Sequence, residues 1–118
     1  MCTDMDSILI SVKKLAGIDA EYEVFDPDII MYINMVFLGL FQMGIGPKKV
    51  FSIEDASSTW DEFEEGNDDL KACRAYIAQK VKLKFDPPTS ATVMQALKES
   101  IDETEWRLIH QVEVERNL

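Results

Sequence analysis

The segment from residue 26 to residue 47 constrains the fold more than any other part of the chain. It opens with Asp26-Pro27, where Asp26 is predicted to cap a helix by accepting from its free amides. It closes with Gly44-Ile45-Gly46-Pro47, which is a typical helix end. Residues 29–41, between these boundaries, are apolar or glycine apart from Asn34. A membrane-spanning helix needs about 20 apolar residues, so this run is too short and predicts a helix inside a water-soluble fold.

This predicted helix is apolar on almost every side. Ile33 and Phe37 lie on one face, whereas Met31, Met35 and Leu38 lie on the other. A small domain has little room to bury a helix all round, which leaves two alternatives. Either the helix is the central element of the core, or one of its faces meets another subunit.

Three further helices are predicted from boundary residues and apolar spacing. The first runs from about residue 4 to 16, with Thr3 and Asp6 as a capping box and Gly17 as a left-handed stop. The third starts near residue 67 or 68 and ends at Asp86-Pro87-Pro88, and Thr89 or Ser90 caps the fourth. The predicted inner stripes are Met5, Ile8, Leu9, Val12 and Leu15 in the first helix, Leu70, Cys73, Ile77 and Val81 in the third, and Val93, Leu97, Ile101, Thr104 and Leu108 in the fourth, which Trp106, Ile109 and Val112 widen.

The chain is therefore predicted to be all-α, with a single domain, residues 1–118, built as a small bundle of about four helices. Residues 48–66 lack a helical period and form an irregular loop between the second and third helices. A short strand or β-hairpin around Val50-Phe51-Ser52-Ile53 is an alternative for part of this loop. Two aromatic residues in it, Trp60 and Phe63, either pin the loop to the core or contact a partner. Residues 113–118 are expected to form a flexible tail.

The residue inventory argues against catalysis and against a cofactor. The chain has one histidine, His110, and two cysteines, Cys2 and Cys73, which match neither a hydrolytic triad nor a standard four-ligand zinc site. The acidic segment that starts at Asp61 fails the calcium-loop template, because Phe63 and Ala72 stand where the template needs oxygen ligands. We therefore predict a protein that is not an enzyme and that uses no metal and no cofactor.

Charge is both high and segregated along the chain. The formal net charge is −10, so we expect neither nucleic-acid binding nor membrane binding. Residues 54–69 hold eight acids and no base, whereas residues 71–84 hold five bases and no acid. The two stretches either attract each other weakly within one molecule or form separate patches that favour head-to-tail association.

These features define the candidate contact residues. They are the aromatic and acidic residues Trp60, Asp61, Glu62, Phe63, Glu64 and Glu65, the basic residues Lys71, Arg74, Lys80, Lys82 and Lys84, and the C-terminal residues Glu113, Val114, Glu115, Arg116, Asn117 and Leu118.

Several segments, taken in their order, resemble a known family. They are Asp28-Ile29-Ile30-Met31-Tyr32-Ile33-Asn34, Gly44-Ile45-Gly46-Pro47, Thr59-Trp60-Asp61-Glu62-Phe63, Val81-Lys82-Leu83-Lys84-Phe85-Asp86-Pro87-Pro88 and Glu105-Trp106-Arg107-Leu108. Together they are similar to the small head–tail connector proteins of tailed phages and prophages of Gram-positive bacteria. The resemblance covers nearly the whole chain.

This resemblance implies a head-completion, or adaptor, protein of the virion that is assembled in the host bacterial cytoplasm. Such proteins are helical bundles that form a homo-oligomeric ring beneath the portal, extend the DNA channel and offer a surface to the next connector or tail component. The family has no catalytic residues. Whether the free protein is a monomer before it binds the portal remains open. A different alternative, based on charge alone, is an acidic helical regulatory module such as a DNA mimic or an anti-activator.

Overall fold

The structure is a computed structural model of the chain, and it describes residues 7–19, 21–46, 49–65, 68–85 and 87–116. Its elements, in chain order, are α1 (Ile8–Leu15), α2 (Asp26–Gln42), α3 (Trp60–Glu64), the 3₁₀-helix η1 (Asp68–Lys71), α4 (Ala72–Phe85) and α5 (Ala91–Arg116). The described residues contain no strand, only an isolated β-bridge between Ser7 and Thr59. The all-α prediction is confirmed.

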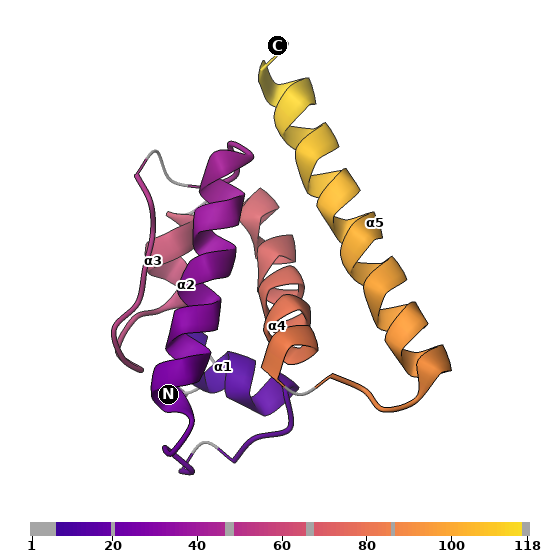
Figure 1. Ribbon diagram of the computed structural model, residues 1–118. Helices are drawn as coiled ribbons and strands as arrows, with labels where there is room; N and C mark the ends of the chain where they lie inside the picture. Colours follow the sequence, from indigo (N-terminus) through magenta and orange to yellow (C-terminus); the bar gives the residue numbers. More distant parts are fainter. Residues whose placement is uncertain (1–6, 20, 47–48, 66–67, 86, 117–118) are drawn as a thin grey trace.

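The helix α4 lies at the centre of the bundle. It packs against α1, α2 and α5, whereas α5 rests mainly on α4. Figure 1 shows α2 and α5 on either side of α4 and antiparallel to it, with the first turns of α5 farthest from α2. Of the two alternatives for α2, the one that makes it the central element of the core is therefore not supported. The other alternative, in which one face of α2 stays free for a contact, agrees with this arrangement.

The end of α4 and the start of α5 agree with the sequence prediction, whereas α4 begins at Ala72, after the 3₁₀-helix η1, and not at residue 67 or 68. The Ser90 hydroxyl caps α5 by accepting a hydrogen bond from the Val93 amide at 3.3 Å. Of the predicted inner residues, Cys73, Ile77, Val81, Ile101 and Leu108 are buried. Val93 and Trp106 are exposed instead of buried. Val93 lies near the start of α5, which has 26 residues and so extends beyond the 14 residues of α4, whereas Trp106 lies on the opposite side of α5 from the buried Ile101 and Leu108.

The helix α1 is shorter than predicted. It begins at Ile8, because Ser7 is extended and its hydroxyl accepts a hydrogen bond from the Ile10 amide. The same hydroxyl donates to the Ala56 carbonyl at 2.8 Å, so a contact remote in sequence fixes the helix start. The predicted Thr3 cap lies outside the described residues. The predicted stop at Gly17 is confirmed, with φ of 82° at that residue.

The inner face of α1 also differs from the prediction at one turn. Leu15 is exposed, whereas Lys13 is only 1% exposed. The Lys13 ammonium lies 2.7 Å from the Asp26 carboxylate and donates to the Tyr22 carbonyl at 2.7 Å. Asp26 therefore forms an ion pair instead of the predicted helix cap. An unpaired buried charge costs several kcal/mol and a missing cap about 1 kcal/mol, which explains why Asp26 pairs with Lys13 and does not cap α2.

The loop after α2 contains a helix that the sequence prediction missed. The helix α3 has five residues, too few to show a helical period, and the Thr59 hydroxyl caps it by accepting from the Glu62 amide. The strand predicted around Ile53 is also wrong. The Ile53 backbone pairs with the side chain of Asn34, which accepts from its amide at 2.8 Å and donates to its carbonyl at 3.0 Å. This contact explains the single polar residue in the apolar run of α2.

Gly46→Ala is expected to destabilise the fold by about 2–3 kcal/mol. Gly46 has φ of 98°, which costs a side-chain-bearing residue about 1–2 kcal/mol. A Cβ there would lie 2.9 Å from Cε1 of the buried Phe63 ring, which adds the cost of overpacking. Urea unfolding followed by circular dichroism measures the loss. Gly17→Ala is the matched control, because its φ is 82° but no atom lies within 4 Å of the new Cβ. Equal losses in the two variants would contradict the role given to Phe63.

Candidate functional site

One face of α2 is apolar and uncovered. Met31, Met35 and Leu38 are exposed by 52%, 52% and 44%. They follow one another at intervals of four and three residues, so they form a continuous row, which we call the α2 strip. The opposite face of the helix, with Ile33 and Phe37, is buried in the core. An exposed apolar row of this kind is typical of a surface that meets another protein.

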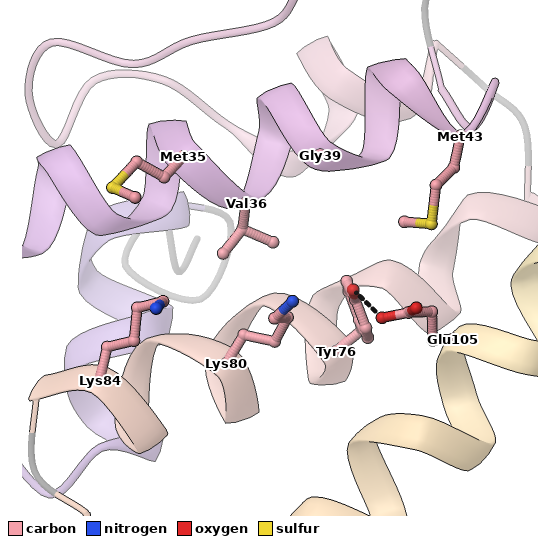
Figure 2. Close-up of a pocket in the computed structure, with 8 residues that line it drawn as sticks. All are labelled: Met35, Val36, Gly39, Met43, Tyr76, Lys80, Lys84 and Glu105. Atoms are coloured by element: carbon pink, nitrogen blue, oxygen red, sulfur yellow. Dashed lines mark hydrogen bonds between the residues drawn. The ribbon is translucent and has the colours of Figure 1, made fainter.

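A groove borders the α2 strip on the side of α4. Figure 2 shows its lining, and we call it the α2–α4 groove. Its volume is about 330 Å³, at the lower end of the about 300–1,000 Å³ typical of small-molecule sites, so it has room for a few side chains. The lining residues are Met35, Val36 and Gly39 of α2, its C-cap Met43, Tyr76, Lys80 and Lys84 of α4, and Glu105 of α5.

The end of the groove near α5 is closed by a hydrogen bond. The Tyr76 hydroxyl donates to a carboxylate oxygen of Glu105 at 2.8 Å. Burial of the Tyr76 phenol, followed by this bond to Glu105, raises the pKa of Tyr76 far above its usual value. The phenol therefore stays protonated and acts as a donor, so it is not an activated nucleophile or base. Its role in the groove is to join α4 to α5.

The floor of the groove carries two positive charges. Lys80 and Lys84 are one turn apart on α4, and both side chains point toward α2 in Figure 2. The Lys80 ammonium lies 5.4 Å from the centre of the Tyr76 ring. Neither lysine forms an ion pair with a carboxylate among the described residues. The groove therefore combines apolar walls with unneutralised cations, which favours an apolar group that carries acids.

The structure places the predicted aromatic residues in the core. Trp60 and Phe63 are 1% and 2% exposed. The Phe63 ring packs against Phe37 and Phe51, and the Trp60 indole donates to the Ser11 hydroxyl at 3.1 Å. Their burial supports the alternative in which they pin the loop, because a buried ring cannot contact a partner without rearrangement.

Part of the segregated charge is neutralised within the molecule. The guanidinium of Arg74 donates to both carboxylate oxygens of Glu64, at 2.6 and 3.0 Å, and the Glu64 side chain is buried. Arg74 also lies 5.6 Å from the centre of the Trp60 ring. The predicted attraction between the acidic loop and α4 therefore occurs inside one copy for this pair. Asp61, Glu62 and Glu65 are exposed around it.

The remaining predicted residues lie apart from the groove. Lys71 ends η1, and Lys82 faces a smaller pocket of about 160 Å³ beside Leu15 of α1. Residues 113–116 belong to α5, which extends to Arg116, and Asn117 and Leu118 lie outside the described residues. The flexibility expected for residues 113–118 stays a prediction.

The sequence prediction found Lys80 and Lys84 but missed the other residues of the groove. A signal was present in their spacing. Met35, Gly39 and Met43 repeat every four residues along α2 and its C-cap, and Tyr76, Lys80 and Lys84 do so in α4. Rows with this spacing form ridges on a helix surface. The spacing does not show which ridges face each other, so the groove needed the three-dimensional structure.

Three further features concern the reactivity of the Cys73 thiol, metal binding and membrane insertion. The Cys73 thiol is fully buried, and burial, followed by the charge of Glu64, raises its pKa to about 12. Within the described ranges, no group of three histidine, cysteine, aspartate or glutamate side chains is placed to hold a metal ion. None of the helices in those ranges is long and apolar enough to cross a membrane.

Comparison with known proteins identifies one family. The model of the family described as phage connector protein matches residues 8–115. No curated protein and no solved structure matches the chain.

Proposed function

The chain belongs to the phage connector protein family, and we propose that it is a head–tail connector, or adaptor, which binds the portal as a ring and extends the DNA channel toward the tail. The family match over residues 8–115 is the observation that carries this proposal, because it includes all helices of the bundle. The protein is thus a structural component of the virion. Its assembly takes place in the bacterial cytoplasm.

The surface of the molecule supports a role in protein contacts. The α2 strip and the α2–α4 groove leave apolar side chains uncovered in a single copy, which a neighbouring protein would bury. The net charge of −10 also suits a channel for DNA, because like charges keep the duplex from adhering to the wall. The proposed partners are the portal protein, other copies of this chain and the next connector or tail component.

The test is assembly with portal rings from the same phage or prophage gene cluster. Purified protein is mixed with these rings and imaged by negative-stain electron microscopy. An additional ring of density at the tail-proximal end of the portal is the expected result. A folded protein that leaves intact portal rings bare would contradict the proposal and would favour the acidic regulatory module, which a pull-down from host lysate can then examine.

The C-terminal residues are proposed to make the portal contact. A chain that ends at Val112 lacks residues 113–118 and keeps the part of α5 that packs on α4, including Ile101 and Leu108. We expect it to remain folded and to lose portal binding in the same experiment. The matched control is Lys98→Met, a change on an exposed part of α5. Unchanged binding of the shortened chain would exclude this segment as the docking site.

A further inference from the structure

The α2–α4 groove has an order of features along its length. Lys84 lies at one end beside Met35, Lys80 follows one helical turn away, and Tyr76 with Met43 forms the other end (Figure 2). A turn of α-helix spans about 5.4 Å, so at steps of about that size the groove presents two cations and then the Tyr76 ring with Met43, where the hydrogen bond from Tyr76 to Glu105 closes the groove. A fitting occupant needs acid, acid and a large apolar group with the same spacing.

The outer face of α5 carries such an order. Glu99, Glu103, Trp106 and His110 are spaced by four, three and four residues, so they share one face of the helix, and we call this row the α5 ridge. All four residues are exposed. Trp106 is 64% exposed, and its ring stacks on His110 with an angle of 4° between the planes. An exposed, preordered tryptophan is typical of an interface anchor.

The two acids of the α5 ridge are only weakly engaged in the single copy. Glu103 pairs with Arg107 at 2.6 Å, and both side chains are well exposed, so this surface pair contributes little. Glu99 accepts a hydrogen bond from the exposed Gln95 amide at 3.1 Å. Both carboxylates can therefore take a new cationic partner at small cost.

We propose that the α2–α4 groove of one copy receives the α5 ridge of a second copy, with Glu99 at Lys84, Glu103 at Lys80 and Trp106 against Tyr76 and Met43. This register requires the incoming α5 to run antiparallel to α4. The side chains of the ridge, not the whole helix, then fill the groove, which agrees with its volume of about 330 Å³.

The proposed contact is head-to-tail, because the groove and the ridge are different surfaces of the same copy. A contact of that kind leaves one groove and one ridge free at the ends of every open assembly. Copies can therefore continue to add until the assembly closes into a ring. This inference rests on the proposed function, because the contact that it assigns is the one between neighbouring copies in the connector ring. It differs from the earlier head-to-tail alternative, because the acids come from α5 and not from residues 54–69.

Charge reversal tests the contact. Lys80→Glu with Lys84→Glu gives a groove variant, and Glu99→Lys with Glu103→Lys gives a ridge variant. Each places like charges opposite one another, so self-association should weaken by more than about 100-fold. The variant with all four changes restores opposite charges with inverted sign and should associate again. Asp61→Lys with Glu62→Lys, on the exposed face of α3, is the matched control and should associate as the unmodified protein does.

The anchor is tested separately with Trp106→Ala. Removal of an interface tryptophan should weaken association by at least about 30-fold, whereas the fold should persist because the ring is exposed in the single copy. Sedimentation velocity over a concentration series measures association, and circular dichroism confirms folding. The same variants are then added to portal rings and imaged by negative stain.

The outcomes separate this inference from the proposed function. Loss of self-association in both double variants and its recovery in the fourfold variant support the contact. Normal association of the groove variant, or failure of the fourfold variant to recover, overturns it even if the protein still forms a ring on the portal. Unmodified protein that binds the portal only as isolated copies also overturns it and leaves portal binding intact. Protein that associates through this contact but ignores the portal supports the inference and contradicts the proposed function.

Discussion

Trp60→Ala is expected to remove about 3–5 kcal/mol of stability, a large part of the about 5–15 kcal/mol that holds a typical domain together. The Trp60 side chain is among the largest that are fully buried, at 1% exposure. Its loss leaves a cavity, removes the hydrogen bond to the Ser11 hydroxyl and takes away the surface on which the Arg74 guanidinium rests. Because Arg74 is also the partner of buried Glu64, the damage extends to that ion pair.

Urea unfolding followed by circular dichroism measures this loss, and the chain offers a matched control. Trp106→Ala deletes the same side chain at a position that is 64% exposed, where substitutions usually change stability by no more than about 0.5 kcal/mol. Trp60→Phe keeps most of the buried ring and should fall between the two. A Trp60→Ala variant as stable as Trp106→Ala would show that the loop containing α3 contributes little to the core.

Asp26→Asn is expected to destabilise the fold by about 3–5 kcal/mol, more than Lys13→Met does. Both changes break the ion pair between α1 and the start of α2. The first leaves the ammonium of Lys13 charged at 1% side-chain exposure, whereas the second leaves the carboxylate of Asp26, whose Oδ1 is buried but whose side chain is 21% exposed, so water reaches part of it. Loss of one partner of a buried pair is costly because the other charge remains desolvated.

The double variant completes the test of this pair. Lys13→Met combined with Asp26→Asn removes both charges, so its loss of stability should be smaller than the sum of the two single losses. Equilibrium unfolding in urea gives all three values, and Lys98→Met controls for loss of an exposed lysine. Additive losses, or a larger loss in Lys13→Met than in Asp26→Asn, would contradict the account of burial given above.

Sequence reasoning succeeded where local chemistry decides the structure. The end of α4 before Asp86-Pro87-Pro88 and the cap of α5 at Ser90 follow from properties of the residues themselves. It failed where a remote contact decides. Ser7 is extended and its hydroxyl donates to the Ala56 carbonyl, and Asp26 pairs with Lys13 instead of capping the helix start. Neither partner can be identified from spacing along the chain.

The candidate site divides in the same way. Charge along the sequence singled out Lys80 and Lys84, and both lie in the α2–α4 groove. The same argument selected Arg74, which the fold uses inside one copy to neutralise Glu64. Opposite charges in sequence do not reveal whether they meet within a molecule or between molecules. Trp106 was assigned to the inner stripe of α5, because the apolar spacing does not show that the buried face is as narrow as the row of Ile101 and Leu108.

The attachment of α5 has a consequence for the way the native state opens. The helix is held by the buried side chains of Ile101 and Leu108 and by hydrogen bonds to α4, among them those from Tyr76 to Glu105 and from Gln79 to Ser100. Most of the core belongs to α1, α2 and α4 and does not depend on it. Detachment of α5 is therefore a partial opening with a smaller free energy than global unfolding. We therefore expect a partner that binds α5 to change the position of this helix at a smaller cost than unfolding of the core that α1, α2, α3 and α4 form.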